Sequence, residues 1–387
     1  MSKKNILFIP SNSNHVRLFY PIYKILNEKF HILFLTQGSY KNEGAEDALL
    51  ELGIDFRKID DYDTNEPEII MKKEQISIVV VANDIDVIPQ WFINTATKMG
   101  IPSVYLQDGL LFDYKTPARS FIDSIFKKSG SRMKLRSLAS KLLLSKKIQR
   151  LTTHGVVPST MIHVWGRQAQ NYLTGKGVDK ERILITGSML TSRIKNISNN
   201  TGNLEKTILY TPSDLVFSGI IKPKELHAII HQVCSSLSPL GYKIIVKPHP
   251  SEDILIFNTL EGKYPNVEIS GQNIYDLLSH SSLVITDLSS FALEALAANR
   301  PLVIFFPEIE KIVEPNSYAL DLVEKNAAFL AKDTHELLGQ VRNILENESL
   351  QNMESVKKVV EEYLGKMDGT EAVRSANSII ELMDEYT

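Results

Sequence analysis

Two polar segments in the C-terminal half combine residue types that can bind a phosphate. Segment 247–250 reads Lys-Pro-His-Pro, and segment 287–290 reads Asp-Leu-Ser-Ser. Each follows a predicted strand, at 242–246 and 283–286, and the second precedes a helical pattern. Serine hydroxyls and free backbone N–H groups at the start of a helix suit an anion such as a diphosphate. These segments therefore predict a site for a phosphate-containing ligand.

Individual side chains in this half suggest separate tasks in that site. Prolines on both sides fix the direction of His249, which can bind a phosphate or give a proton to a departing one. Glu294, one turn into a helix predicted over 291–298, can accept hydrogen bonds from ribose hydroxyls. Each feature also has a structural explanation, since Asp287 or Ser289 can simply cap the helix and His249 can be an exposed loop histidine. The other donor-side candidates are Lys247, Ser290, Thr211 and Ser213.

A carboxylate in the N-terminal half can act as a general base. Asp108 follows the apolar run 103–106, and Gly109 after it permits a sharp turn. Such a carboxylate can take a proton from an acceptor hydroxyl, although an Asp-Gly pair is also a common ordinary turn. His15, in a polar loop that can equally well cap a helix starting near residue 16, is the second candidate base. The other acceptor-side candidates are Ser13, Asn14, Asn83, Asp84, Gln107 and Gly109.

Metal and disulfide chemistry have little support in the sequence. The one Asp-X-Asp match, at 84–86, is interpreted as a chance match in a loop, so we expect no metal. Negative charge on a leaving phosphate would instead be met by Ser289, Ser290 and His249. The single cysteine, Cys234, can form neither an internal disulfide nor a cysteine-based zinc site.

Composition narrows the class of protein. The 387 residues carry 43 Lys and Arg against 46 Asp and Glu, a net charge of −3, which argues against a dedicated nucleic-acid binder. The apolar run at 6–9 is too short for a signal peptide, and no stretch reaches the ~18 apolar residues of a membrane span. We expect a cytoplasmic location, with a peripheral position on the inner face of the cell membrane as the alternative.

One segment departs from this charge balance. Residues 127–150 carry nine Lys or Arg and no Asp or Glu, and Leu135, Leu138 and Leu142 share one helical face. A basic amphipathic helix of this kind suits an anionic membrane surface. A solvated surface helix whose leucines pack on its own domain explains the same pattern, so both interpretations stay open.

Short β-branched runs alternate with helical patterns along the whole chain, which indicates strand–helix–strand units. Runs without polar alternation, such as the one at 78–81, are typical of parallel strands covered on both faces. The expected fold class is α/β, with two Rossmann-like, doubly wound domains facing a cleft. The expected strands are 6–9, 32–36, 76–82, 103–107, 162–165, 183–186, 207–211, 242–247, 267–270, 283–286, 301–306 and 328–331.

The polar stretch 196–205 is the expected linker between the two domains. The first domain is predicted over 1–195, on the acceptor side, and the second over 203–365, on the nucleotide-donor side. Residues 366–387 are predicted to form a C-terminal helix that packs back on the first domain. The tail is expected to be two helices separated around Gly369.

Three motifs together resemble those of a known enzyme group. Segments 107–109, 247–250 and 286–290 resemble the acidic-Gly, His-Pro and Ser-Ser motifs of bacterial sialyltransferases and polysialyltransferases, which have the two-domain GT-B fold. The last two also resemble motifs of the CDP-glycerol glycerophosphotransferases of teichoic-acid synthesis. Connecting segments common in this superfamily match at 164–166, 185–188 and 294–301.

The resemblance implies roles for the candidate residues. Asp108 would be the general base, and His249 would contact the donor phosphate or act as general acid. Ser289 and Ser290 would bind the nucleotide phosphate, with Glu294 near the ribose. The implied function is a metal-independent glycosyltransferase of capsule or cell-envelope biosynthesis, which moves a sugar from a CMP-, CDP- or UDP-linked donor to a polysaccharide or glycolipid. The nucleotide sugar is a co-substrate, and no other cofactor is expected.

Three alternatives remain beside this one. The sialyltransferase motif usually has two acids before the glycine, and here the first position is Gln107. A polyol-phosphate transferase of the CDP-glycerol type is one alternative. An epimerase similar to the non-hydrolysing UDP-N-acetylglucosamine 2-epimerases is another, although those enzymes carry paired glycines at the positions of Ser289 and Ser290. A non-catalytic protein that binds glycans or nucleotides is the third.

Overall fold

The computed structural model describes residues 4–40, 43–82, 86–111, 159–190, 194, 197, 206–216, 219–250, 252–260, 262–307, 317–347 and 352–386. These residues form two compact units. Unit 1 takes the described residues up to Leu111, those from 159 to Met189, and those from Tyr363 onward, while unit 2 takes those from Leu190 to Glu362. Asn83, Asp84, the basic segment 127–150 and most of the linker at 196–205 lie outside the described residues.

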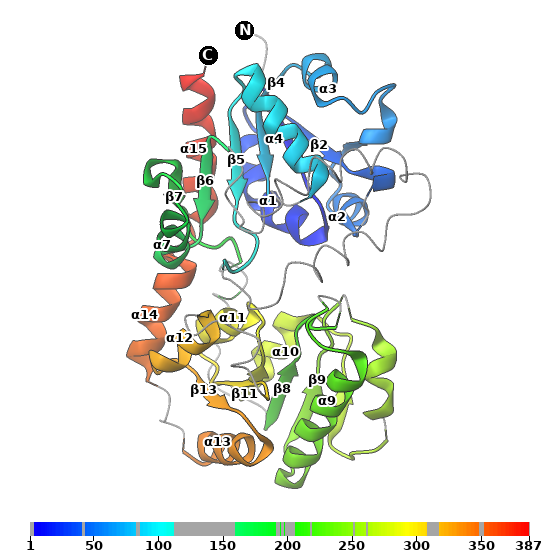
Figure 1. Cartoon of the computed structure of the whole chain (residues 1–387), viewed down its shortest axis with the longest axis vertical. Coiled ribbons are helices and arrows are strands. Elements are labelled where there is room, and N and C mark those ends of the chain that lie inside the picture. The colour runs from blue at the N-terminus through cyan, green and yellow to red at the C-terminus, as the bar shows by residue number, and fades with distance from the viewer. Residues whose placement is uncertain are drawn as a thin grey trace. The chain divides into compact units, whose positions relative to one another are not determined.

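Unit 1 contains a seven-stranded parallel sheet in the order β3-β2-β1-β4-β5-β6-β7 (Figure 1). Every strand that was expected in this half is present, to within one residue at each end. Sequence patterns missed the short β3, because only one of its three residues is apolar. The strands are β1 (Asn5–Ile9), β2 (His31–Thr36), β3 (Phe56–Lys58), β4 (Ile76–Val81), β5 (Ser103–Leu106), β6 (Met161–Val164) and β7 (Ile183–Ile185).

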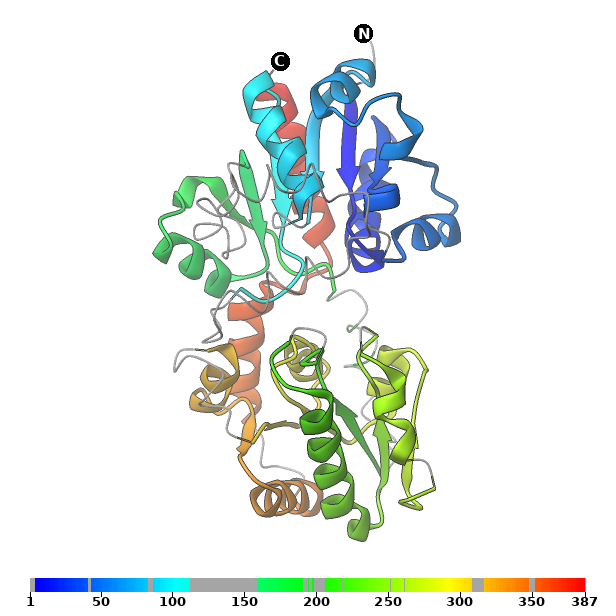
Figure 2. The same ribbon diagram turned by 45° about the vertical axis from the view of Figure 1, so that its right-hand side comes forward.

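Alternate residues of the central strands supply two separate cores. Leu7 and Val79 pack on one face of the sheet, whereas their neighbours Phe8 and Val80 pack on the other. Helices α3 (Pro67–Lys73), α4 (Val87–Met99) and α7 (Arg167–Gly175) cover the first face. Helices α1 (Ser13–Leu26), α2 (Ala45–Glu51) and α15 (Glu371–Glu385) cover the second. Figure 2 shows α4 and α15 on opposite sides of the sheet. Coverage of both faces confirms the prediction drawn from the uninterrupted apolar runs.

Unit 2 repeats this design with six parallel strands in the order β10-β9-β8-β11-β12-β13. Both units are therefore Rossmann-like α/β domains, as the sequence predicted. The strands are β8 (Thr207–Thr211), β9 (Lys243–Val246), β10 (Val267–Ile269), β11 (Leu283–Thr286), β12 (Leu302–Phe305) and β13 (Phe329–Ala331). The helices are α9 (Pro223–Leu237), α10 (Ile274–His280), α11 (Phe291–Ala297), α12 (Tyr318–Glu324) and α13 (Thr334–Glu346).

The C-terminal tail forms α14 (Met353–Leu364) and α15, and the second of these belongs to unit 1. Gly365, directly after α14, has a left-handed φ of +75°, and a Cβ there would overlap the carbonyl oxygen of Trp165. The side chain of His163 on β6 then ties α15 to the sheet. Its Nδ1 lies 2.8 Å from the hydroxyl of Ser375, and its Nε2 lies 3.0 Å from that of Ser378.

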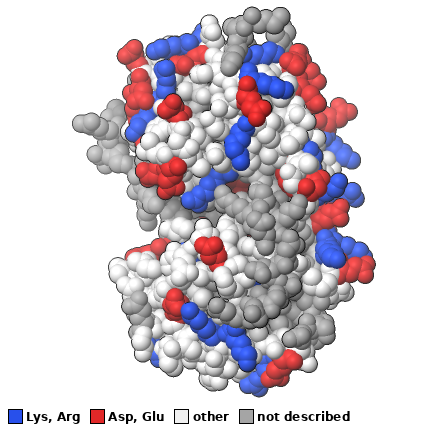
Figure 3. Space-filling view, turned by 180° about the vertical axis from the view of Figure 1, so that it is seen from behind, with Lys and Arg blue, Asp and Glu red and all other residues white. Residues whose placement is uncertain are grey.

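The described surface mixes charges of both signs. On the face shown in Figure 3, Lys and Arg side chains are interspersed with Asp and Glu. This agrees with the nearly neutral composition. Among the helices that the structure describes, none combines the length and the apolar character needed to cross a membrane.

Candidate active site

The loops at the carboxyl ends of the strands carry the candidate residues of both units. In open parallel sheets, ligands bind at these ends, near the point where the strand order reverses. That point lies between β1 and β4 in unit 1 and between β8 and β11 in unit 2. His15 and Asp108 follow β1 and β5, while Asp287 and its neighbours follow β11.

Unit 1 brings His15 and Asp108 together. The Nε2 atom of His15 lies 2.8 Å from Oδ2 of Asp108. The histidine sits in the first turn of α1, whose N-cap is Asn12, and the side-chain oxygen of Asn12 accepts the backbone N–H of His15 at 3.0 Å. This cap starts the helix at Ser13, three residues earlier than expected. The loop therefore caps the helix and also positions a candidate catalytic side chain.

Hydrogen bonding fixes the proton on His15. The backbone N–H of Ser11 points at Nδ1 at 3.0 Å, and because a backbone N–H can only donate, Nδ1 is the acceptor. Nε2 therefore carries the proton and donates to Asp108. The imidazole side chain is 1% exposed, whereas that of Asp108 is 27% exposed. A buried histidine thus orients a carboxylate that reaches the surface.

A further pair of buried residues supports this arrangement. The Nε2 group of Gln37 donates to the hydroxyl of Ser11 at 2.9 Å, and both side chains are buried. Sequence analysis missed Gln37, although it follows β2 at the same edge of the sheet. The rule that selected Asp108, a polar residue directly after a predicted strand, would have found it.

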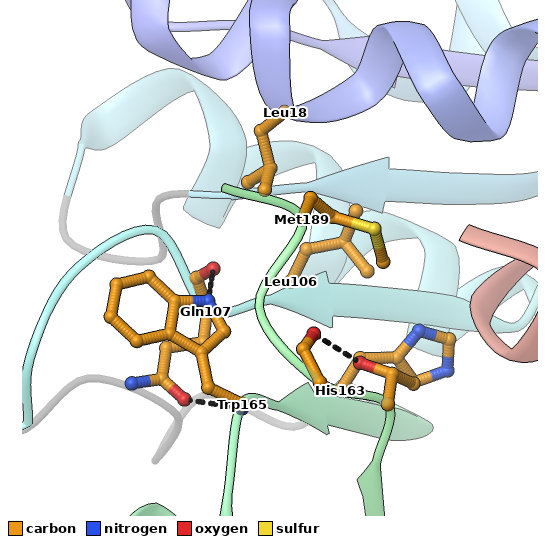
Figure 4. A pocket seen from close by; sticks show the side chains of 8 residues that line it. Leu18, Leu106, Gln107, His163, Trp165 and Met189 are labelled. Carbon is orange, nitrogen blue, oxygen red and sulfur yellow. Dashed lines mark hydrogen bonds between the residues drawn. The ribbon is translucent and has the colours of Figure 1, made fainter. Parts of the chain in front are cut away.

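Gln107 holds the turn that carries Asp108. Its side-chain N–H donates to the carbonyl of Gly109 at 2.8 Å, and its side-chain oxygen accepts the backbone N–H of Trp165 at 2.8 Å. The indole N–H of Trp165 donates back to the Gln107 carbonyl at 2.9 Å (Figure 4). The φ of Gly109 is not left-handed, and a Cβ added to this residue would meet no neighbouring atom, so the expectation that glycine permits this turn was wrong. The amide of Gln107 shapes the turn instead.

Two other acceptor-side candidates, Ser13 and Asn14, lie in the first turn of α1. Ser13 donates its backbone N–H to the carbonyl of Glu43 at 3.1 Å, and the side chain of Asn14 is exposed. Next to the Gln107 turn, a small cavity opens between β5, β6, β7 and α1 (Figure 4). Its lining residues are Leu18, Leu106, Gln107, His163, Trp165, Thr186, Gly187 and Met189.

In unit 2, the buried side chain of Asp287 connects the loop after β11 with the loop after β8. Both of its carboxylate oxygens accept the backbone N–H of Ser213 at 3.1 Å. Burial raises the pKa of Asp287 to about 6, against the opposing effect of the hydrogen bonds from Ser213. The hydroxyl of Thr286, at the end of β11, donates to the carbonyl of Thr211, at the end of β8, at 2.7 Å. Asp287 therefore braces the loop after β8 and does not cap α11.

The two serines lie at the start of α11. The hydroxyl of Ser289 accepts the backbone N–H of Phe291 at 3.2 Å, while the N-cap of this short helix is Ser290, whose side chain makes no capping hydrogen bond within the described helix. Ser290 is half-buried, and Glu294 is buried in the first turn. The structure thus shows which hydrogen bonds the side chains of this segment make, and phosphate binding by the segment stays a prediction.

Lys247 and His249 occupy the loop after β9. Lys247 donates its backbone N–H to the carbonyl of Tyr210 at 2.9 Å, which extends the pairing of β9 with β8 by one residue. Both side chains are half-buried, and burial lowers the pKa of the Lys247 ammonium. Within the described ranges, no group of three or more potential metal ligands occurs.

Two family models match the sequence. The model of the alpha-2,8-polysialyltransferases matches residues 42–285, and that of CDP-glycerol:poly(glycerophosphate) glycerophosphotransferase matches residues 191–381. The first match spans more than half of the 387 residues. No curated protein sequence matches the chain significantly.

Solved structures with the same fold include epimerases and a polymerase. The complex of MnaA with UDP from S. aureus has a TM-score of 0.64 at 15% identity, over 98% of this chain and 97% of that one. UDP-GlcNAc 2-epimerase from Neisseria meningitidis, bound to UDP-GlcNAc, has a TM-score of 0.63 at 13% identity, over 97% and 100%. A variant of the wall teichoic acid polymerase TagF has a TM-score of 0.62 at 16% identity, over 99% and 89%. These similarities confirm the GT-B fold.

Proposed function

The chain belongs to the alpha-2,8-polysialyltransferase family, and on this basis we propose that it transfers a sugar from a nucleotide-activated donor to a hydroxyl of a surface polymer. In this proposal unit 1 activates the acceptor and unit 2 binds the donor. Sialic acid is the sugar that the family name suggests. The acceptor is a polysaccharide or a lipid-linked glycan of the cell envelope. A peripheral position at the inner membrane face also remains a proposal, supported by the composition of 127–150 alone.

The observation that carries the proposal is the hydrogen bond between His15 and Asp108. It holds a partly exposed carboxylate in one orientation, as a general base needs before its substrate arrives. Asp108 takes the proton of the acceptor hydroxyl, and the oxygen then attacks the anomeric carbon of the donor as the nucleotide phosphate leaves. His15 serves as a positioning residue, because both of its ring nitrogens are engaged and its ring is buried.

Unit 2 contains the side chains proposed for the donor. Lys247, His249 and Ser290 are half-buried in loops at the carboxyl ends of β9 and β11, where a nucleotide phosphate can reach them. His249 would bind this phosphate or protonate it as it departs. Ser289 would bind the same phosphate through its hydroxyl, which accepts the backbone N–H of Phe291, and a contact of Glu294 with the ribose stays a proposal. Asp287 acts through Ser213, since its buried carboxylate is occupied there.

A second candidate function rests on the glycerophosphotransferase model. It matches 191–381, so it covers most of unit 2 and the tail. A CDP-linked polyol phosphate would use the same loops for its diphosphate, while the group transferred would be a phosphate ester instead of a sugar. The two functions differ in the donor that supports turnover.

The experiment supplies CMP-, CDP- and UDP-linked donors to the full chain with an acceptor panel. Asp108→Asn preserves size but removes basicity, and should lower turnover by about 10²–10⁴ with unchanged nucleotide affinity. His15→Gln keeps a donor N–H near the Nε2 position and should retain more turnover than His15→Leu. Asp384→Asn, at an exposed carboxylate of the same unit, is the matched control.

Three outcomes would contradict this scheme. More than about a tenth of wild-type turnover in Asp108→Asn, far short of the expected loss, would place the base elsewhere. Isomerised nucleotide sugar formed without any acceptor would support an epimerase. Turnover with CDP-glycerol but with no sugar donor would support the phosphotransferase.

A further inference from the structure

We propose that His227 and His231 form a binding site for a divalent transition-metal ion on the face of α9 that contacts Thr259 and Tyr264 in unit 2. The two residues are four positions apart in one helix, so their side chains lie on the same face. Both imidazoles are half-buried, and their ring centroids are 4.4 Å apart. Histidines at this spacing on a helix are a known arrangement for binding one metal ion. The site lies outside the strand-end loops of the proposed transferase chemistry.

The ring nitrogens of the pair converge on a single point. Nε2 of His227 lies 2.8 Å from the hydroxyl oxygen of Thr259, and Nε2 of His231 lies 3.1 Å from the same oxygen. Metal–imidazole bonds are about 2.0–2.1 Å long. An ion at the position of this oxygen therefore requires the Thr259 hydroxyl to move away and each nitrogen to come about 1 Å closer. Thr259 is exposed, so its side chain can turn toward solvent or add its oxygen to the ion.

The neighbours of His231 determine what must change when an ion binds. Nζ of Lys263 lies 3.3 Å from Nδ1 of His231, and an ammonium group can only donate, so Nδ1 is the acceptor. Nε2 of His231 therefore carries the proton in the metal-free protein and donates it to Thr259. Metal binding requires the other neutral tautomer, in which Nε2 loses its proton and Nδ1 gains one, with no net proton change.

Tyr264 is placed to stabilise that second tautomer. Its hydroxyl lies 3.2 Å from Nδ1 of His231 and can accept the new N–H. Metal-binding histidines usually donate their other ring N–H to an oxygen in this way. Burial lowers the pKa of His231, as do the nearby Lys263 and His227, which favours the neutral form that a ligand needs. Lys263 opposes binding, because it repels a cation and occupies Nδ1.

The ligand set determines which ions fit. Two imidazoles suit Cu²⁺, Ni²⁺ and Zn²⁺, whereas Mg²⁺ and Ca²⁺ prefer oxygen ligands. In the part of the chain that the structure describes, no third histidine, cysteine or carboxylate joins the pair. Water would fill the remaining positions. Cu²⁺ should bind most tightly, because it heads the usual affinity order for such sites.

The test titrates the full chain, without an affinity tag and after chelator treatment, with Cu²⁺, Ni²⁺, Zn²⁺ and Mg²⁺ in a calorimeter. Wild type should bind the first three and not Mg²⁺. His227→Gln and His231→Gln should each weaken binding at least tenfold, and the double variant should abolish it. Lys263→Met should strengthen binding several-fold, since it removes the competing charge. His335→Gln, in α13, is the matched control and should behave as wild type.

Either of two results would overturn the proposal. One is a wild-type protein that binds none of the three ions at concentrations up to about a hundredfold above the protein. The other is a double variant, shown by circular dichroism to be folded, that keeps wild-type affinity. If Lys263→Met bound the ions more weakly than wild type, Lys263 would not compete with metal binding through its charge and its contact with Nδ1 of His231. Because the measurement is metal binding, its outcome is independent of the transferase activity.

Discussion

At the scale of single residues, the surroundings of Asp108 show how its turn is held by a glutamine at a position where the motif that it resembles usually has an acid. The sialyltransferase motif that segment 107–109 resembles usually has two acids before the glycine, and Gln107 stands at the first of these positions. Here the side chain of Gln107 donates a hydrogen bond to the carbonyl of Gly109 and accepts one from the backbone N–H of Trp165. An ionised carboxylate can only accept. The glutamine thus makes one bond that an acid could not make, and that bond holds the turn on which Asp108 sits.

Replacing Gln107 by Glu tests this role. The ionised side chain loses the bond to Gly109 and places a second negative charge beside Asp108. We expect unit 1 to lose about 1 kcal/mol of unfolding free energy, the usual effect of one lost hydrogen bond. Turnover should fall as well, while Gln107→Met, which loses both bonds, should destabilise unit 1 further. Urea unfolding and steady-state kinetics measure both effects, and a Glu variant with higher turnover would show that an acid is needed here after all.

Asp287 leads to a pH prediction for unit 2. Burial raises its pKa from 3.8 to about 6 in the folded protein. Between these values the folded state binds more protons than the unfolded state, so stability falls as pH rises from about 4 to about 6. The loss amounts to about 3 kcal/mol, since one pKa unit corresponds to about 1.4 kcal/mol.

The variant Asp287→Asn isolates this effect. Asparagine does not titrate, so the difference in stability between wild type and variant should change by that amount across the same pH range. Hydrogen exchange of the β8 and β11 amides measures it in unit 2 specifically. A difference that is independent of pH between 4 and 6 would mean that the carboxylate is already ionised at pH 4.

At the scale of elements, the attachment of α15 decides how the chain is organised. The helix follows unit 2 in sequence but belongs to the core of unit 1, where it packs beside α1. Its buried polar anchor is His163, which meets two serine hydroxyls of the helix. Burial lowers the pKa of His163 to about 3, so the histidine is neutral in the folded protein.

This neutral histidine predicts acid sensitivity in unit 1. Below pH 6.5 the unfolded chain takes up a proton on His163, whereas the folded chain does so only near pH 3. The contribution of this residue to stability is therefore complete above pH 6.5 and declines by about 1.4 kcal/mol for each pH unit below it. His163→Gln should remove this decline, while Ser375→Ala should keep it and lower stability by about 1 kcal/mol at every pH.

Tryptophan fluorescence is a suitable probe for this comparison. The chain has two tryptophans, Trp91 and Trp165, and both belong to unit 1. Urea unfolding followed at pH 7.5, 5.5 and 4.5 therefore reports on the unit that contains His163. Equal pH slopes for wild type and His163→Gln would show that the histidine is accessible to protons in the folded protein.

At the scale of the whole molecule, the two units have the same parallel architecture but different proposed tasks. If unit 2 binds the nucleotide, a ligand should stabilise it most directly. CMP, CDP or UDP at a hundred times its dissociation constant adds about 2.7 kcal/mol. The nucleotide should therefore raise the stability of unit 2, measured by the hydrogen exchange of its amides, more than the stability of unit 1, measured by tryptophan fluorescence. Ser290→Ala should reduce it, and a nucleotide that protects only unit 1 would contradict the assignment.

Much of this molecule follows from the sequence because the signals are local. Uninterrupted β-branched runs can be buried only between two layers of helices, so the parallel strands and both Rossmann-like domains were predictable. Polar residues directly after those strands marked the candidate segments, since parallel strands end at a common edge. The short edge strand β3 escaped because Phe56 is its one apolar residue.

Only the tertiary structure decided what each candidate side chain does. The bond between His15 and Asp108 spans 93 residues of sequence, and that between Ser213 and Asp287 spans 74. Such contacts depend on how loops from different strands meet, which no local pattern encodes. The proton on His15 depends further on the direction of the Ser11 backbone N–H. Residue types and spacing thus marked the candidate segments, while contacts between distant loops determined which side chains meet and which nitrogen of His15 carries its proton.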